Sequence, residues 1–243
     1  GSEASRAHAV RYAFFVERFY SGAPGKLLDV GCGDGEFLAH AAELGWQCHG
    51  VEMDGRTRER VASRPGVLSM SASLDDVGES EFDCITLFES IEHLTDPAGA
   101  LCACRDLLRP GGSVIIKTPN AMSLERRALG PDWVSLEIPR HLHFFSSNSL
   151  RRCLTIAELE VRSVFCPSGE QALTRSVWLA LSGRGQAVAG GTAEFRPQSW
   201  RRTADQAITR ALHPLWWTLG KLRLGHTILV HAVRPREEQS IGR

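Results

Sequence analysis

The chain has 243 residues, of which 43% are hydrophobic and 23% are charged. These proportions are typical of a globular protein that buries a core, and they argue against a disordered chain. The length suits one α/β domain with additions better than two independent domains. Basic and acidic residues number 28 each, so the total charge gives no indication of a nucleic-acid or membrane-surface protein.

The charge is unevenly distributed along the chain. Residues 1–96 hold 17 acidic and 8 basic residues, so the remainder carries the compensating positive charge. This division suggests an acidic cofactor half and a basic substrate half, although ordinary surface variation explains it equally well. No apolar run approaches the roughly 18 residues of a membrane span, and no signal-peptide region precedes the domain. We therefore expect a cytoplasmic protein.

Cysteine usage agrees with that expectation. The seven cysteines have no spacing typical of a disulfide framework, so buried thiols in a reducing compartment explain them best. Cys102 and Cys104 form a CxC pair within a predicted helix. No second pair of ligands lies near them, so we interpret them as core residues and predict no metal site.

The first predicted element is a helix over residues 4–20, where apolar side chains recur at helical spacing. Gly1-Ser2 before it resembles a scar left by tag cleavage. Short apolar runs then alternate with amphipathic stretches. We predict strands at 27–30, 48–52, 67–70, 82–87 and 113–117, and helices at 35–44, 54–64 and 97–108. This alternation indicates βαβ crossovers and a parallel sheet with helices on both faces.

The last third of the chain departs from the alternation. We predict a helix over residues 148–157 and a strand over 159–165, then a long helical segment with tryptophans over 171–224. A closing strand is predicted at 227–233. Such an ending allows an antiparallel strand to be added to the sheet.

The clearest functional motif is LLDVGCGDGEFL at residues 27–38. A predicted strand ends at Val30, and a predicted helix begins a few residues later. Between them, Gly31, Gly33 and Gly35 allow the backbone to turn sharply and to approach a ligand closely. The motif therefore predicts a ligand-binding turn at the end of the first strand.

Acidic residues around the turn indicate which class of ligand it binds. Dinucleotide-binding turns have glycine or alanine where Glu36 stands. Asp29, just before the turn, suits the ammonium group of a ligand that carries an amino acid. Glu52 ends the next strand, at the position where a carboxylate accepts hydrogen bonds from ribose hydroxyls. The following Met53 could pack on an adenine ring, whereas Glu52 alone could simply favour a helix N-terminus.

Four segments together resemble a known family. LLDVGCGDGEFL, HGVEMD, EFDCITLFESIEHLTDP and LLRPGGSVIIKTPN, in this order and spacing, resemble the motifs of class I S-adenosylmethionine-dependent methyltransferases. The branch with the pattern EHLxDP, represented by ubiquinone-biosynthesis O-methyltransferases, is the most similar. PRHLHFFSSNSLRRCL at residues 139–154 is similar to the segment after the fifth strand in that branch. The resemblance covers about residues 25–165 and the final strand.

The resemblance implies an α/β fold with a Rossmann-like seven-stranded sheet in the order 3-2-1-4-5-7-6, whose last strand is antiparallel. Helices would cover both faces, and a helical insertion would precede the last strand. The implied cofactor is S-adenosyl-L-methionine, which becomes S-adenosyl-L-homocysteine. By position, the cofactor-binding residues would be Asp29, Gly31, Cys32, Gly33, Gly35, Glu52, Met53, Leu74, Leu87, Phe88 and Glu89. Residues 71–74 lack the acidic residue that relatives often place against adenine, so the adenine contact stays open.

Methyl transfer from a sulfonium is an in-line displacement, for which the protein chiefly aligns the reacting groups. A hydroxyl acceptor would in addition need a base, and histidine titrates in the right range. His141, His93 and His143 lie in the family motifs, and His141 ranks first because its loop should reach over the active-site mouth. These rings could instead cap helices or brace the loop. Arg140 and Lys117 could attract an anionic acceptor or could be solvated surface cations.

The insertion contains a basic stretch with tryptophans at residues 196–223. It could form weak peripheral contact with a membrane, or serve as a lid that packs its tryptophans on the core. We divide the chain into an N-terminal helix with the tag scar, a cofactor-binding core, an acceptor-side insertion, and a closing strand with a tail. These parts cover residues 1–24, 25–168, 169–224 and 225–243.

Three functional hypotheses follow. The first is a methyltransferase that acts on a hydroxyl of a small molecule, such as a natural product or a quinone-like compound, or of a glycan. Nitrogen and carbon stay open as acceptor atoms. The second is a nicotinamide-dependent oxidoreductase, which Glu36 and the EHLxDP segment disfavour. The third is a binding module that keeps the cofactor fold without catalysis.

Overall fold

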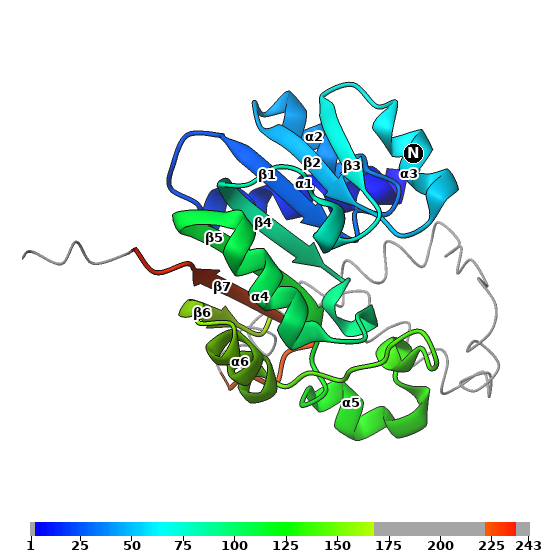
Figure 1. Cartoon of the computed structure of the whole chain (residues 1–243). Helices are drawn as coiled ribbons and strands as arrows, with labels where there is room; N and C mark the ends of the chain where they lie inside the picture. Colours follow the sequence, from blue (N-terminus) through cyan, green and yellow to red (C-terminus); the bar gives the residue numbers. More distant parts are fainter. Residues whose placement is uncertain (1–2, 168–221, 237–243) are drawn as a thin grey trace, which may run out of the picture.

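Seven strands form one sheet in the order β3-β2-β1-β4-β5-β7-β6 (Figure 1). The computed structural model describes residues 3–167 and 222–236. The strands are β1 (Lys26–Val30), β2 (Gln47–Val51), β3 (Val67–Ser71), β4 (Phe82–Phe88), β5 (Leu108–Pro119), β6 (Glu160–Phe165) and β7 (Thr227–Val233). Strands β1 to β5 pair in parallel, whereas β7 runs antiparallel to both β5 and β6. The predicted strand order and the antiparallel last strand are confirmed.

Helices cover both faces of this sheet (Figure 1). They are α1 (Glu3–Phe19), α2 (Glu36–Glu43), α3 (Gly55–Ala62), α4 (Pro97–Leu107), α5 (Leu124–Leu129) and α6 (Ser147–Ile156). Short 3-10 turns add η1 (Leu74–Asp76), η2 (Ile91–His93), η3 (Gly130–Asp132) and η4 (Val134–Leu136). The predicted helices agree with this arrangement to within one or two residues at most ends.

Local sequence explains where several helices begin. Asp54 accepts a hydrogen bond from the Thr57 amide at the start of α3, and Asp96 accepts one from the Gly99 amide at the start of α4. Ser146 forms a reciprocal capping box at the start of α6. Each cap satisfies an amide that has no partner within its helix.

The two faces of the sheet have separate hydrophobic cores. On one face, Ala13 of α1, Leu38 of α2 and Val61 of α3 pack against the sheet. On the other face, the core includes Leu101 of α4 and Leu150 of α6. This division matches a helix-covered parallel sheet whose strands are apolar on both sides.

The predicted CxC pair belongs to the second core. Cys104 is buried there, and Cys102 packs against it at the edge. Every cysteine in the described ranges has a free thiol. The pair therefore serves packing, as its position in α4 suggested.

Two features differ from the sequence expectation. Strand β5 begins at Leu108 rather than 113, because Leu108 pairs with Phe82 before the register shifts next to Gly111 and Gly112. The second difference is α5 with the turns η3 and η4, for which we predicted no element. These turns matter for the site because they carry the loop that leads to His141.

The chain returns to the sheet close to where it left it. The Thr227 amide donates to the Pro167 carbonyl at 3.2 Å, and Asn120 donates through Nδ2 to the carbonyl oxygens of Arg223 and Gly225. Most of the predicted insertion at 169–224 lies outside the described residues. Within 3–167 and 222–236, no helix combines the length and the apolar character needed to cross a membrane.

Candidate active site

The glycine turn after β1 is shaped by packing on one side and by open space on the other. All three glycines have positive φ, at 76° for Gly31, 53° for Gly33 and 73° for Gly35. A Cβ on Gly31 would lie 2.7 Å from the Ser90 Cβ, and one on Gly35 would lie 2.6 Å from a Val61 methyl. A Cβ on Gly33 would meet nothing within 4 Å. The turn therefore exposes the Gly33 backbone to a ligand.

Glu52 is tied to this turn. Its Oε2 atom accepts a hydrogen bond of 3.1 Å from the Gly33 amide, and its Oε1 atom accepts one of 2.9 Å from the Asp54 amide. The carboxylate thus lies beside the glycine turn, where ribose hydroxyls could reach it. Met53, which follows it, is 87% exposed and open to a flat ligand.

Asp29 lies on the other side of the turn, at the end of β1. It is only 4% exposed, and its Oδ1 atom accepts a hydrogen bond of 2.7 Å from the Thr86 hydroxyl. Burial raises the pKa of Asp29 to about 7, since a charged carboxylate loses hydration there. A bound ligand with an ammonium group would lower this pKa again and favour the ionised carboxylate.

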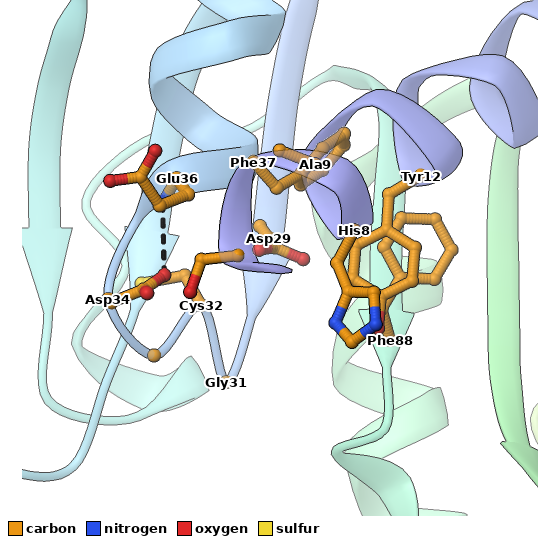
Figure 2. Close-up of a pocket in the computed structure, with 12 residues that line it drawn as sticks. His8, Ala9, Tyr12, Asp29, Gly31, Cys32, Asp34, Glu36, Phe37 and Phe88 are labelled. Atoms are coloured by element: carbon orange, nitrogen blue, oxygen red, sulfur yellow. Dashed lines mark hydrogen bonds between the residues drawn. The ribbon is translucent and has the colours of Figure 1, made fainter. Parts of the chain in front are cut away.

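Between these groups lies a pocket that α1 covers from one side. Figure 2 shows His8 and Tyr12 of α1, together with Phe88 of β4, facing Asp29 and the turn. The Tyr12 and Phe88 rings stack with centroids 4.3 Å apart. The pocket is lined by Ser5, His8, Ala9, Tyr12, Asp29, Gly31, Cys32, Gly33, Asp34, Glu36, Phe37 and Phe88.

The contribution of α1 was missed by the sequence analysis. Ser5, His8, Ala9 and Tyr12 follow the pattern i, i+3, i+4 and i+7, so they lie on one helix face. This spacing was visible in the sequence. Nothing in the sequence indicated that this face would lie over the glycine turn.

The remaining cofactor candidates lie in different environments. Leu87 is fully buried in the core on the α4 side, and Leu74 packs partly against the same core. Neither lines the pocket, whereas Cys32 and Phe88 do. Burial raises the pKa of the Cys32 thiol, which therefore stays protonated and unreactive.

Glu89 directly follows β4 in a strained backbone conformation with φ at 52°. Its carboxylate forms an ion pair with Lys117 at the end of β5, and the Lys117 ammonium lies 5.7 Å from the centroid of the Tyr12 ring. Burial lowers the pKa of Lys117 to about 7, while the adjacent carboxylate favours the charged form. The Lys117 side chain is thus only 14% exposed and is not a solvated surface cation.

A second group of side chains lies beyond β4. Glu92, His93 and His141 each offer one ligand atom, and these atoms all lie within 4.8 Å of one another. The ring centroids of His93 and His141 are 4.8 Å apart. The sequence placed both histidines in motifs but left them unconnected, because 47 positions separate Arg140 from the His93 ring that it contacts.

Hydrogen bonds to carbonyl oxygens indicate which tautomer each neutral ring adopts. The His93 Nδ1 atom lies 2.8 Å from the Arg140 carbonyl oxygen, and the His141 Nδ1 atom lies 2.8 Å from that of Ser135. A carbonyl oxygen only accepts, so Nδ1 carries the proton in each neutral ring. The Nε2 atoms therefore keep their lone pairs, as a base or a metal ligand requires.

Glu92 completes the group from a buried position. Its Oε2 atom accepts a hydrogen bond of 2.9 Å from the Thr118 hydroxyl, and Oε1 has no hydrogen-bond partner among the described residues. Burial raises the pKa of Glu92. Two imidazoles and a carboxylate could accept protons or could hold a divalent cation. The sequence analysis assembled no such set.

His143 and Arg140 lie outside this group. The His143 ring lies 5.9 Å from the Phe145 ring, and its amide donates to the Glu92 carbonyl. The Arg140 side chain is largely exposed and forms an ion pair with Glu137. Of the three predicted base candidates, the structure therefore brings together His93 and His141.

Comparisons of the sequence agree with the motifs. A family model described as a methyltransferase domain matches residues 5–164. A ubiquinone biosynthesis O-methyltransferase of Alkalilimnicola ehrlichii is 31% identical over 62% of this chain and 67% of its own length. A protein of the same name from Methylococcus capsulatus is 34% identical over 55% and 60%, respectively. The matched stretch thus spans about three fifths to two thirds of these curated relatives.

Solved structures agree with the fold. The structure of a complex between the Haloferax volcanii Trm112 methyltransferase activator and a methyltransferase matches with a TM-score of 0.62, at 16% identity, over 98% of this chain and 92% of that one. Geranyl diphosphate C-methyltransferase of Streptomyces coelicolor, solved with S-adenosyl-L-homocysteine, matches with a TM-score of 0.59 at 16% identity over 93% and 76%. These similarities establish a common architecture.

Proposed function

The chain belongs to the methyltransferase-domain family, and from this membership we propose that it methylates a hydroxyl group of a small molecule, with His141 as the base. It is an S-adenosyl-L-methionine-dependent methyltransferase. The names of the curated relatives support oxygen as the acceptor atom and a quinone-like compound as the acceptor. The alternatives are a natural product or a glycan hydroxyl, and nitrogen or carbon as the acceptor atom.

The pocket residues fit this cofactor. When bound, S-adenosyl-L-methionine supplies a methyl group on a positively charged sulfur. The space beside Gly33 admits a ligand against the backbone, and the Asp29 carboxylate offers a partner for the ammonium group. Glu52 can accept hydrogen bonds from the ribose hydroxyls. Because α1 covers the pocket with Tyr12, it would exclude water from the cofactor.

The assignment of a base depends on one observation: His93 and His141 each bring a ring nitrogen to within 4.8 Å of a Glu92 carboxylate oxygen. We assign the proton of the acceptor hydroxyl to Nε2 of His141, because its Nδ1 proton is already donated to a carbonyl. Glu92 would then stabilise the imidazolium that forms. His93 stands beside it as a second acceptor, with the same tautomer.

The acceptor side would extend beyond these residues. We propose that residues 169–224, most of which lie outside the described part of the chain, form the acceptor-side insertion. The basic, tryptophan-containing stretch 196–223 would add weak contact with an anionic membrane surface. Sedimentation with anionic liposomes at low salt tests the contact, and a protein that stays in the supernatant would contradict it.

The proposal is tested with the full chain. Isothermal titration should detect binding of S-adenosyl-L-homocysteine and none of a nicotinamide dinucleotide. Transfer of a labelled methyl group to a panel of phenols, catechols, amines and sugars then identifies the acceptor atom. We expect methylation of phenolic oxygen. Labelling of amines alone, or binding of cofactor without transfer to any acceptor, would contradict the proposal.

Replacement of His141 tests the base. We expect His141→Gln to lower turnover at least about tenfold while cofactor affinity is preserved, since general bases contribute about 10²–10⁴-fold. His143→Gln is the matched control, because that ring lies outside the group. Unchanged turnover in His141→Gln would remove His141 from the mechanism.

A further inference from the structure

A hydrogen-bonded chain of side chains runs behind the proposed base. The Glu125 carboxylate lies 2.7 Å from Nδ1 of His226, and Nε2 of His226 lies 3.4 Å from the Ser135 hydroxyl. The carbonyl oxygen of the same Ser135 accepts the hydrogen bond of 2.8 Å from Nδ1 of His141. The chain thus connects a carboxylate to the ring that is assigned the proton transfer.

These hydrogen bonds join two neighbouring segments to a distant one. Glu125 belongs to α5, Ser135 belongs to η4, and His226 directly precedes β7. The Glu125 and His226 side chains are only 8% and 12% exposed. The Trp133 ring lies 6.3 Å from the His226 ring and covers its surroundings. Burial of both side chains strengthens this contact, because little water competes for either group.

The donors and acceptors follow one direction. An ionised carboxylate only accepts, so Nδ1 of His226 donates to Glu125. Nε2 of His226 is then free to accept from the Ser135 hydroxyl. Ser135 is held on its side-chain oxygen, while its carbonyl faces His141. The orientation of this carbonyl determines which nitrogen of His141 carries the proton.

The local backbone explains why Ser135 needs this support. It lies in η4, which is only one turn long, and Ser135 departs from helical geometry there with φ at −89° and ψ at 17°. One short turn supplies few hydrogen bonds of its own. The side-chain contact with His226 therefore supplies an anchor that the backbone does not.

We propose that Glu125 and His226 are positioning residues, which keep His141 in the tautomer that can accept a proton. This inference rests on the proposed function, since it concerns the same base. Without the pair, the Ser135 carbonyl would lose its fixed orientation. The His141 ring would then also populate the tautomer with the proton on Nε2, which has no lone pair for an acceptor proton.

The same order of carboxylate, imidazole and hydroxyl occurs in hydrolase triads. Here the hydroxyl belongs to a residue that is only 8% exposed and does not line the pocket beside the glycine turn. The group of Ser135 that contacts His141 is its carbonyl oxygen, not its hydroxyl. The arrangement therefore suits orientation of His141 better than attack on a substrate.

Nitrogen-15 NMR of the histidine rings tests the proposal directly. In the full-length wild-type protein at neutral pH, long-range correlation spectra should show His141 protonated on Nδ1 and unprotonated on Nε2. His141→Gln identifies its signals by their disappearance. We expect Glu125→Gln and His226→Phe to shift the His141 signals toward a mixture of tautomers. The exposed pair of His40 and Glu43, 3.1 Å apart on α2, provides the control variant Glu43→Gln.

Kinetics provide the second readout. In Glu125→Gln we expect kcat to fall about tenfold, a typical loss for a residue that orients a catalytic group. Affinity for S-adenosyl-L-homocysteine should stay within a factor of about two, because neither residue lines the pocket beside the glycine turn. KM for the acceptor should change as little, because the substitution acts on the proton transfer and not on acceptor binding. Glu43→Gln should match the wild type in both measurements.

The following results would overturn the positioning role of Glu125 and His226. A wild-type spectrum with the proton on Nε2 of His141 would overturn the proposal without any variant. Unchanged His141 signals and kcat in Glu125→Gln would also overturn it. Should Glu125→Gln fold poorly, Ser135→Ala removes only the hydroxyl contact and gives the same test. Full activity of His141→Gln would reject the base itself, while the wild-type spectrum would still decide the positioning.

Discussion

The Thr86 hydroxyl donates a hydrogen bond of 2.7 Å to the buried carboxylate of Asp29, across the pairing of β1 with β4. This hydrogen bond gives the buried carboxylate at the end of the strand a polar partner. Asp29 is thus prepared to meet a cation from the pocket side. The arrangement links the stability of the protein to the binding of its cofactor.

We predict opposite effects of Asp29→Asn on stability and on binding. The pKa of Asp29 lies at about 7, above its ordinary value of 3.8, so the ionised form opposes folding. The folded state is therefore most stable with respect to this group below about pH 4, where the carboxyl is protonated in both states. That stability is lost as the pH rises through about 7 and the buried carboxyl ionises. At pH 8 the variant should therefore unfold at a higher temperature than the wild type, and its free energy of unfolding should be larger by up to about 4 kcal/mol.

The same variant should bind S-adenosyl-L-homocysteine about tenfold more weakly at pH 8, because a charged acceptor has become neutral. Below pH 7 the wild-type affinity should fall toward that of the variant, as Asp29 takes up a proton. Titration calorimetry across this range provides the check. Equal affinities of the two proteins at pH 8 would show that Asp29 has no role in binding.

We predict that Gly31 and Gly33, two of the three glycines of the turn, are needed for different reasons. Gly31→Ala places a Cβ 2.7 Å from the Ser90 Cβ at a φ of 76°, so it should destabilise folding by about 1–3 kcal/mol. Gly33→Ala meets no atom within 4 Å and should cost only about 1 kcal/mol. It should nevertheless weaken cofactor binding strongly, because its methyl group points into free space that a ligand would use. Urea unfolding combined with calorimetry separates the two effects.

We predict that α1 contributes to cofactor affinity through an aromatic ring. Tyr12→Ala removes the ring that stacks on Phe88 at 4.3 Å and should raise the Kd for S-adenosyl-L-homocysteine about tenfold, as is typical for loss of a buried aromatic contact. Tyr12→Phe should leave it nearly unchanged. Phe14→Ala is the matched control on the same helix, since Phe14 is 59% exposed. Equal loss in Phe14→Ala would indicate that the helix as a whole was disturbed.

We predict that Zn²⁺ binds to the group of Glu92, His93 and His141 and inhibits methyl transfer. Inhibition follows from the proposed mechanism, because the ion would occupy the lone pairs that accept the proton. The inhibition should be reversed by EDTA and should be weakened in His93→Ala but not in His143→Ala. Activation by the ion would contradict the role of His141 as a base and assign the group to metal binding.

Much of the fold was accessible from the sequence because its signals are local. Apolar runs such as 82–87 mark buried strands, and the caps at Asp54 and Asp96 mark helix starts. The turns between 124 and 136 were not predicted. Their positions depend on long-range contacts, such as those of Asn120 with the Arg223 and Gly225 carbonyls, which leave no periodic pattern.

The site residues also fall into those that local sequence signals predicted and those that depend on long-range packing. The glycine turn and Glu52 were predicted because adjacent strand ends must meet at one edge of a parallel sheet. The covering face of α1 and the meeting of His93 with His141 were not. Both arise from packing between segments far apart in the chain, and no spacing within the sequence encodes it.

The contact between the Thr227 amide and the Pro167 carbonyl has an evolutionary consequence. Because Pro167 and Thr227 are already joined there, the free energy of bringing these two ends together depends only weakly on the number of residues between them. Lineages could lengthen, shorten or replace that stretch without altering the order of the strands. Under the proposed role of residues 169–224 on the acceptor side, exchange of this one stretch would change the acceptor and leave the half of the molecule that holds the methyl donor as it is.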